Sequence, residues 1–264
     1  MAKPSGRRTA GCRPRTLRFS SRPALTEPHA SLPHLARPRR GNGRAFITRT
    51  CFNAAGYSYA NKFVTFPELV ALKGTDVAPL GSVPSLTLPS GRTVVQSAAL
   101  ARFAAKKAGI YPRDDDEAAL LIDEIFETAL EFANKVPQTP DKEASARNQR
   151  PIFASDRARL PMLCASLATQ QLKVKLRAEF VEKEFPRFLG FLTKRLGAGP
   201  FFFGGADKFT LADLSVYQVL NAISTSDWDH VDPSVLDKFP EMKAFYERAK
   251  AHEFVVKHGP LKLE

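Results

Sequence analysis

The sequence lacks any uninterrupted apolar run that approaches the roughly 18–20 residues needed to cross a bilayer. This absence predicts a soluble protein without a membrane partner. Cysteine is also scarce, since Cys12, Cys51 and Cys164 are widely spaced and form neither a metal-ligand pattern nor a disulfide framework. We therefore expect no metal, and a reducing compartment is the simpler assumption. With 264 residues, 44% of them hydrophobic, the chain can form one or two packed domains.

Acidic residues are almost missing from the first 44 positions, and this accounts for most of the net charge of +12. That segment holds eleven Lys or Arg residues and one acid, Glu27, whereas the remaining 220 residues hold 28 basic and 26 acidic groups. The basic character therefore belongs to the N-terminal tail and not to a folded face. No recognition helix or aromatic-interleaved basic strand accompanies it, so we expect no nucleic-acid partner.

Residues 1–42 also lack hydrophobic periodicity, and they carry six prolines. Such a segment buries too little apolar area to offset the entropy cost of ordering, so we expect a disordered basic tail. Its many arginines and serines also fit an organelle transit peptide, and an incorrectly predicted first exon is a third explanation. The sequence does not separate these interpretations.

The periodicity predicts two folded units after the tail. Residues 43–112 form a small α/β unit, and residues 113–264 form an all-α bundle, because long amphipathic patterns follow there without strands. The expected elements are helices over 44–55, 66–73 and 96–108, strands over 57–63 and around Pro84 and Gly91, and then helices over 115–136, 173–196, 209–223 and 239–251. Pro151 and Pro161 interrupt the pattern within 148–172, so this stretch is either an insertion or a broken helix.

The segment from Gly81 to Leu86, taken with the later pair Gln96–Ser97, predicts a cradle for a small anion. Pro84 has a restricted φ and no N–H, and a cis bond before it fits such a bend. Ser97 opens a helix, where the first amides and the macrodipole favour a carboxylate. An ordinary hairpin followed by a capped helix fits the same residues, so both interpretations stay open at this point.

A second motif, GGADKFTLADL at residues 204–214, combines a turn with a helix start. Thr210 is a good N-cap, and Asp213 can reach back to the amide of that cap, which makes a capping box. Phe209 and Leu214 can form the accompanying hydrophobic staple. Well-capped helices are common, so this box becomes informative only in combination with the upstream unit.

Five blocks in this order resemble the cytosolic glutathione transferases, most closely the sigma-like class. They are residues 42–45 (NGRA), 83–84 with 96–97, 103–112 (FAAKKAGIYP), 122–125 (IDEI) and 203–214. The resemblance covers about residues 43–264, and 148–172 fit it poorly. It implies the glutathione S-transferase fold, with a thioredoxin-like domain over 43–112 that lacks a normal first strand, and a helical C-terminal domain over 113–264.

The resemblance also implies a site for glutathione, a tripeptide with two carboxylates, an amine and a thiol. Gln96 and Ser97 would hold the γ-glutamyl carboxylate. Val83, before the family's cis-proline Pro84, would pair its backbone with the cysteinyl part as an added strand does. Lys73 would meet the glycine carboxylate.

Two further positions follow from the same resemblance. Arg44 matches an arginine at the start of the family's first helix, and Glu131 takes the place of an acid that reaches the partner's γ-glutamyl amine in family dimers. The implied partners are glutathione as co-substrate, a small hydrophobic electrophile and a second copy of the chain, with no metal.

The residue that would activate glutathione is missing from this pattern. In this class a Tyr hydroxyl at the end of the first strand lowers the pKa of the thiol, because the thiolate is the nucleophile. Counting back six residues from Arg44 reaches Pro38, and no Tyr precedes Tyr57. No credible strand precedes Gly41, and nothing marks Ser31, the nearest hydroxyl, as a strand-end residue. The sequence therefore identifies no catalytic residue.

Two functions remain open. An active glutathione transferase would conjugate the thiolate to electrophiles in detoxification, or act as a glutathione-dependent isomerase or peroxidase. A non-catalytic relative would bind glutathione or serve as a scaffold, as crystallin-like members do. The cytoplasm is the expected compartment, or a plastid or mitochondrion if residues 1–42 are a transit peptide.

Overall fold

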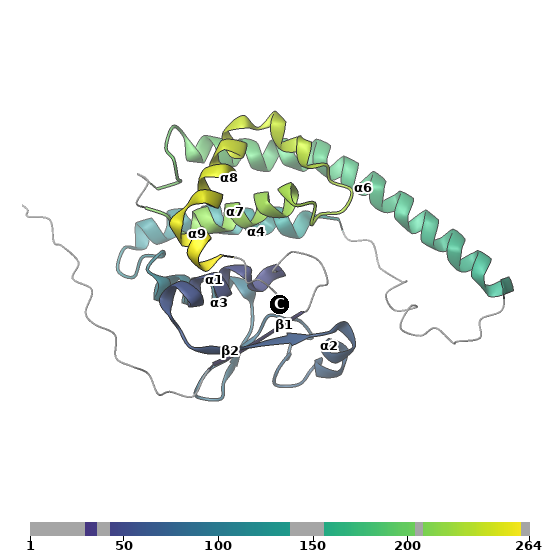
Figure 1. The fold of residues 1–264 in the computed structure, drawn as a ribbon, viewed down its shortest axis with the longest axis horizontal. Coiled ribbons are helices and arrows are strands. Elements are labelled where there is room, and N and C mark those ends of the chain that lie inside the picture. Colours follow the sequence, from purple (N-terminus) through teal and green to yellow (C-terminus); the bar gives the residue numbers. More distant parts are fainter. Residues whose placement is uncertain (1–29, 36–42, 138–155, 204–207, 260–264) are drawn as a thin grey trace, which may run out of the picture.

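The computed structural model describes residues 30–35, 43–137, 156–203 and 208–259. A small sheet lies on one side, long helices form a bundle on the other, and α1 and α3 lie between them (Figure 1). The strands are β1 (Ala30–Leu35), β2 (Tyr59–Val64), β3 (Leu86–Thr87) and β4 (Thr93–Val94), in the order β2-β1-β3-β4. β1 runs parallel to β2, and β3 runs antiparallel to β1 and β4. The predicted fold class, an α/β unit plus a helical bundle, is confirmed.

The prediction that no strand precedes Gly41 is wrong. β1 lies inside the sheet, where Leu35 is in register with Val64 of β2 and Ser31 with Thr87 of β3. The local pattern concealed this strand because Pro33 lacks an N–H and argues against an interior strand. Its pairing comes from two partner strands that lie far along the chain. The rest of the tail that was predicted to be disordered, Pro38 included, lies outside the described residues.

The layer between sheet and bundle consists of two closely packed helices. They are α1 (Phe46–Ala55), preceded by the 3-10 helix η1 (Gly43–Ala45), and α3 (Ser97–Ala108). The buried face of α3 is rich in alanine, which lets neighbouring backbones come close. Gly56 (φ 59°) ends α1 and Gly109 (φ 79°) ends α3, both in the left-handed conformation that glycine adopts without strain.

The bundle is built around α7 (Leu211–Ser224), which is buried on nearly all sides. Around it are α4 (Asp116–Lys135), α6 (Asp156–Leu196), the 3-10 helix η2 (Pro233–Lys238), α8 (Pro240–Ala251) and the short α9 (Glu253–His258). The short helix α2 (Phe66–Leu72) belongs to the sheet side and starts at a capping box of Thr65 and Glu68. Across the described ranges, no helix has both the length and the apolarity that crossing a bilayer requires.

Helix α6 corrects a second expectation. It runs as one helix of 41 residues, and its first half extends past the other helices in Figure 1. The expected start at 173 and the expected interruption at Pro161 are therefore wrong. A proline inside a helix removes one backbone hydrogen bond and adds one local clash, and α6 accommodates this twice, at Pro161 and at Pro186. Residues 148–155 of the expected insertion lie outside the described residues.

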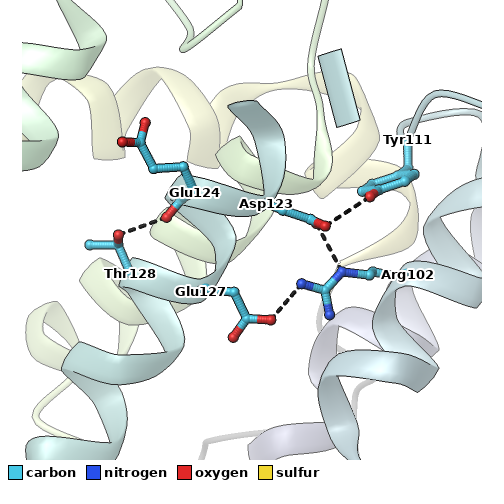
Figure 2. Close-up of polar contacts among 6 residues, drawn as sticks. All are labelled: Arg102, Tyr111, Asp123, Glu124, Glu127 and Thr128. Atoms are coloured by element: carbon cyan, nitrogen blue, oxygen red, sulfur yellow. Dashed lines mark hydrogen bonds and ion pairs between the residues drawn. The ribbon is translucent and has the colours of Figure 1, made fainter. Parts of the chain in front are cut away.

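A polar cluster joins α3 to α4 (Figure 2). The Arg102 Nε donates to Asp123 Oδ1 at 2.8 Å, and the Tyr111 hydroxyl donates to Asp123 Oδ2 at 3.0 Å. Partial burial lowers the pKa of Arg102, but its hydrogen bonds to Asp123 and Glu127 outweigh that and raise it. Burial, and then the bond to Asp123, raises the pKa of Tyr111. The Asp123 carboxylate of α4 therefore binds both Arg102 of α3 and Tyr111, which follows α3, and so joins the α/β unit to the helical bundle.

We predict that Arg102 and Asp123 are energetically coupled. Charge-assisted hydrogen bonds between partly buried groups contribute about 1.5–3 kcal/mol, so Asp123→Ala should lower the free energy of unfolding by about that amount. In a double-mutant cycle with Arg102→Ala, denaturant unfolding should give a coupling of about 1 kcal/mol or more. Additive effects of the two changes would contradict this.

Candidate functional site

The cis peptide bond between Val83 and Pro84 marks the first part of the site. Pro84 and Ser85 are buried, whereas Val83 is only half-buried, so its backbone lies near the surface. The Ser85 hydroxyl donates to the Val77 carbonyl at 2.5 Å and fixes the loop that leads into β3. The expected cis bond is therefore present, at the entrance of a short strand.

The β3–β4 hairpin brings the two predicted segments of the cradle together. Leu86 is in register with Val94, and Thr87 is in register with Thr93. Pro84 and Gln96 each stand two residues beyond the paired Leu86 and Val94, on the side away from the turn of the hairpin. The segments 83–84 and 96–97 therefore flank the open end of one hairpin.

Gln96 has an unusual backbone conformation, with φ 75° and ψ 105°. A non-glycine residue held there stores about 1–3 kcal/mol of strain, and such strain clusters at ligand-binding sites. Gln96 is exposed, and no side chain caps α3 at this end within the part of the chain that the structure describes. Ser97 is the first residue of α3, so its amide lies at the positive end of the helix dipole. The arrangement suits an anion.

Lys73 lies beside the same end of the hairpin. It follows α2, is exposed, and its aliphatic stem passes Gly81, where an added Cβ would lie 3.4 Å from Lys73 Cγ. Gly81 (φ 66°) stands two residues before Val83. The stem of Lys73 therefore lies against the loop that leads to Val83–Pro84.

The other two predicted positions lie at α4: Arg44 contacts this helix, and Glu131 is part of it. Arg44 Nη2 donates to Asn134 Oδ1 at 2.9 Å, and Gln218 Nε2 donates to the Gly43 carbonyl at 2.8 Å, so η1 is tied to the bundle. Glu131 is 54% exposed, with Lys135 Nζ at 3.7 Å and Arg187 Nη2 at 4.0 Å. Weak contacts at such an exposed site leave its carboxylate accessible.

The predicted capping box of Thr210 and Asp213 is present at the start of α7. The fully buried carboxylate of Asp213 accepts from the Thr210 amide and hydroxyl, both at 2.8 Å, and from the Phe202 amide at 3.0 Å. Burial raises the pKa of Asp213, and these hydrogen bonds oppose the rise. The similar Thr65–Glu68 box was missed, although its T-x-x-E spacing is readable in the sequence.

Residues 161–258 match a family model described as "Glutathione S-transferase, C-terminal domain". A probable glutathione S-transferase 5 of Caenorhabditis elegans is 28% identical over 211 residues, which are 80% of this chain and 87% of that protein. The solved structure of NaGST-2 is 26% identical, with a TM-score of 0.61 over 87% of this chain and 94% of that one. The chain is thus similar to cytosolic glutathione S-transferases in its C-terminal half, in sequence and in fold. S-crystallin 2 of Octopus vulgaris is also similar, at 26% identity over 80% of this chain and 87% of that protein.

The described tyrosines nearest the sheet are held in structural contacts. Tyr57 stacks on Phe52 with ring centroids 4.6 Å apart, and the Tyr59 hydroxyl donates to Asn53 Oδ1 at 3.3 Å. Burial raises the pKa of Tyr59. Burial also raises the pKa of Cys51, which makes that thiol unreactive. These contacts keep Tyr57, Tyr59 and Cys51 in the packing around α1 and β2.

Proposed function

We propose that this chain binds glutathione at the open end of the β3–β4 hairpin and transfers its thiolate to small hydrophobic electrophiles. The observation that carries this is the exposed Gln96, whose positive-φ backbone begins the uncapped helix α3 at the open end of the β3–β4 hairpin. A free peptide edge beside a helix N-terminus suits a peptide-like ligand that carries a carboxylate.

Each part of glutathione then has a partner of suitable chemistry. The γ-glutamyl carboxylate binds Gln96, the Ser97 hydroxyl and the first amides of α3. The half-buried Val83 pairs its backbone N–H and C=O with the cysteinyl residue. The Lys73 ammonium reaches the glycine carboxylate, since its stem already passes the loop before Val83.

Glu131 and Arg44 have a different role in this proposal. In a homodimer, the exposed Glu131 carboxylate of one copy reaches the γ-glutamyl amine bound to the other. Arg44, held by Asn134, positions the start of α1 against α4 beside the site. The proposal needs no metal, and it places the protein in the cytoplasm, or in an organelle if residues 1–42 are a transit peptide.

The alternative is a protein of this fold that binds glutathione without catalysis, or that serves as a scaffold. The similarity to an S-crystallin is the observation that favours it. Calorimetric titration with glutathione, followed by an assay with a chlorinated aromatic electrophile, separates the two. Binding with conjugation supports the transferase, and binding without turnover supports the non-catalytic alternative. Absence of binding contradicts every version of the proposal in which this site holds glutathione.

We predict that Gln96→Gly weakens glutathione binding without destabilising the fold. Glycine adopts φ 75° without strain, so the free energy of unfolding should stay level or rise by about 1 kcal/mol. Loss of the amide contacts to the ligand should raise Kd about tenfold in calorimetry.

Ser226→Gly is the matched control, because Ser226 is exposed and also has a positive φ, 57°, but follows α7 in the bundle. It should change stability as Gln96→Gly does and leave Kd unchanged. Equal affinities of the two variants and the unmodified chain would show that the strain at Gln96 serves no ligand.

A further inference from the structure

A buried guanidinium on α6 carries hydrogen-bond donors that the described part of the chain does not satisfy. The Arg177 side chain is 3% exposed, and its Nη2 donates to Asp229 Oδ1 at 3.2 Å. Its Nε and Nη1 are buried and have no acceptor among the described residues. Buried polar groups in folded proteins nearly always have a hydrogen-bond partner, so two such nitrogens on one cation indicate an acceptor outside the described chain.

The Asp229 carboxylate already serves a second cation. Lys173, one turn before Arg177 on α6, donates from its Nζ to Asp229 Oδ2. Burial raises the pKa of Asp229, but the bond from Lys173 and the charges of Lys173, Arg177 and His230 outweigh burial and lower it. Burial lowers the pKa of Arg177, and the Asp229 carboxylate offsets this only in part. One shared carboxylate therefore compensates the positive charge of this cluster incompletely.

An aromatic pair lies directly beside these charges. Lys173, Arg177 and Phe180 are four and three positions apart on α6, so they share one face of the helix. Phe180 packs against Trp228, with ring centroids 6.1 Å apart, and Trp228 precedes Asp229. Arg177 is thus placed between a charged rim and an aromatic floor. In such surroundings an unsatisfied donor is costly, and an acceptor supplied to it binds strongly.

We propose that Lys173, Arg177 and His230 form a binding site for a small oxyanion, a phosphate group or a carboxylate, between α6 and the segment after α7. The anion accepts from Arg177 Nε or Nη1, and Lys173 and the exposed His230 contact it from the solvent side. Because the two nitrogens are buried, only a small anion reaches them. It enters as the Asp229 side chain, which is 48% exposed, turns toward solvent. The site belongs to the helical bundle and is separate from the proposed glutathione site at the start of α3.

Trp228 gives a direct readout, because it is the single tryptophan of the chain and stands next to Asp229. Sodium phosphate, added to the full chain at an ionic strength held constant with sodium chloride, should change its emission along a saturable curve. The expected Kd is on the order of 1 mM. Parallel titrations with sulfate and acetate identify the source: a response to acetate assigns a carboxylate, and a response to phosphate and sulfate alone assigns a phosphate group. Absence of a saturable change with all three anions would overturn the proposal.

Arg177→Gln should raise the Kd for phosphate at least about tenfold, because it removes the donors and the charge. Arg195→Gln is the matched control, since it removes the same charge from the same helix at an exposed position bonded to Glu124. It should leave Kd unchanged. Asp229→Asn should lower Kd about fivefold, because it removes a negative charge next to the anion. Equal Kd values for the two arginine variants would contradict the assignment to Arg177.

Two further variants keep the test decisive. Should Arg177→Gln fail to fold, Lys173→Gln must weaken phosphate binding while Asp229→Asn tightens it, and unchanged affinities in both would overturn the proposal. Gln96→Gly should respond to phosphate as the intact chain does. If Gln96→Gly abolishes the Trp228 signal, the anion binds at the start of α3 and the site at Arg177 is wrong.

Discussion

Replacing Phe132 by Ala is expected to lower the free energy of unfolding by about 3–5 kcal/mol, the usual cost of removing a fully buried aromatic ring. Phe132 lies in α4 with an exposed fraction of 0%. Its ring centroid is 4.9 Å from that of Phe188, 5.1 Å from Phe185 and 5.4 Å from Phe180, all on α6, and 5.7 Å from Trp228. Four aromatic neighbours on two other segments cannot all collapse into the space that the ring leaves, so a cavity remains.

Trp228 makes this change directly measurable, because it is the single tryptophan of the chain and contacts Phe132 edge-on. Its emission should shift in the folded variant, and denaturant unfolding followed by the same signal gives the stability loss. Leu120→Ala, on the same helix but 68% exposed, is the control and should change stability by no more than about 0.5 kcal/mol. Similar losses for the two variants would show that this aromatic cluster does not stabilise the bundle.

The parts of the fold that were predicted correctly are those whose cause lies within a few residues. Gly56 and Gly109 end their helices through their own backbone freedom, and the capping box at Thr210 needs only a carboxylate three residues later. The cis bond before Pro84 belongs to the same class. Each signal is local, so one sequence is enough to read it.

The parts that were missed depend on partners far along the chain. β1 contains Pro33 and gains its place only by pairing with β2 and β3. The same limit applies to the candidate site. Nothing near Lys73 in the sequence shows that its stem passes Gly81, and nothing near Arg44 predicts its contact with Asn134, ninety positions away. The resemblance supplied the residues of the cradle, but the β3–β4 pairing supplied their common place at one end of the hairpin.

Replacing Asp213 by Ala is expected to destabilise the protein by about 3–5 kcal/mol, because the change leaves buried N–H groups without acceptors. The Asp213 carboxylate accepts hydrogen bonds from the Thr210 amide and from the Phe202 amide. It therefore fixes the start of α7 to the segment before it. α7 is the central helix of the bundle, so the loss is not confined to one exposed end. For a chain of this size the melting temperature should fall by on the order of 10 °C in calorimetry.

The Thr65–Glu68 capping box of α2 provides the matched comparison, since it has the same residue spacing but lies at the surface. There, Glu68→Ala exposes the freed Thr65 amide to water, which hydrogen-bonds it, so the cost should stay near 1 kcal/mol or below. The difference between the two variants therefore isolates the effect of burial from that of the motif itself. If both changes lower the melting temperature equally, the stabilising term is the capping geometry alone, and the buried bond to the Phe202 amide contributes nothing beyond it.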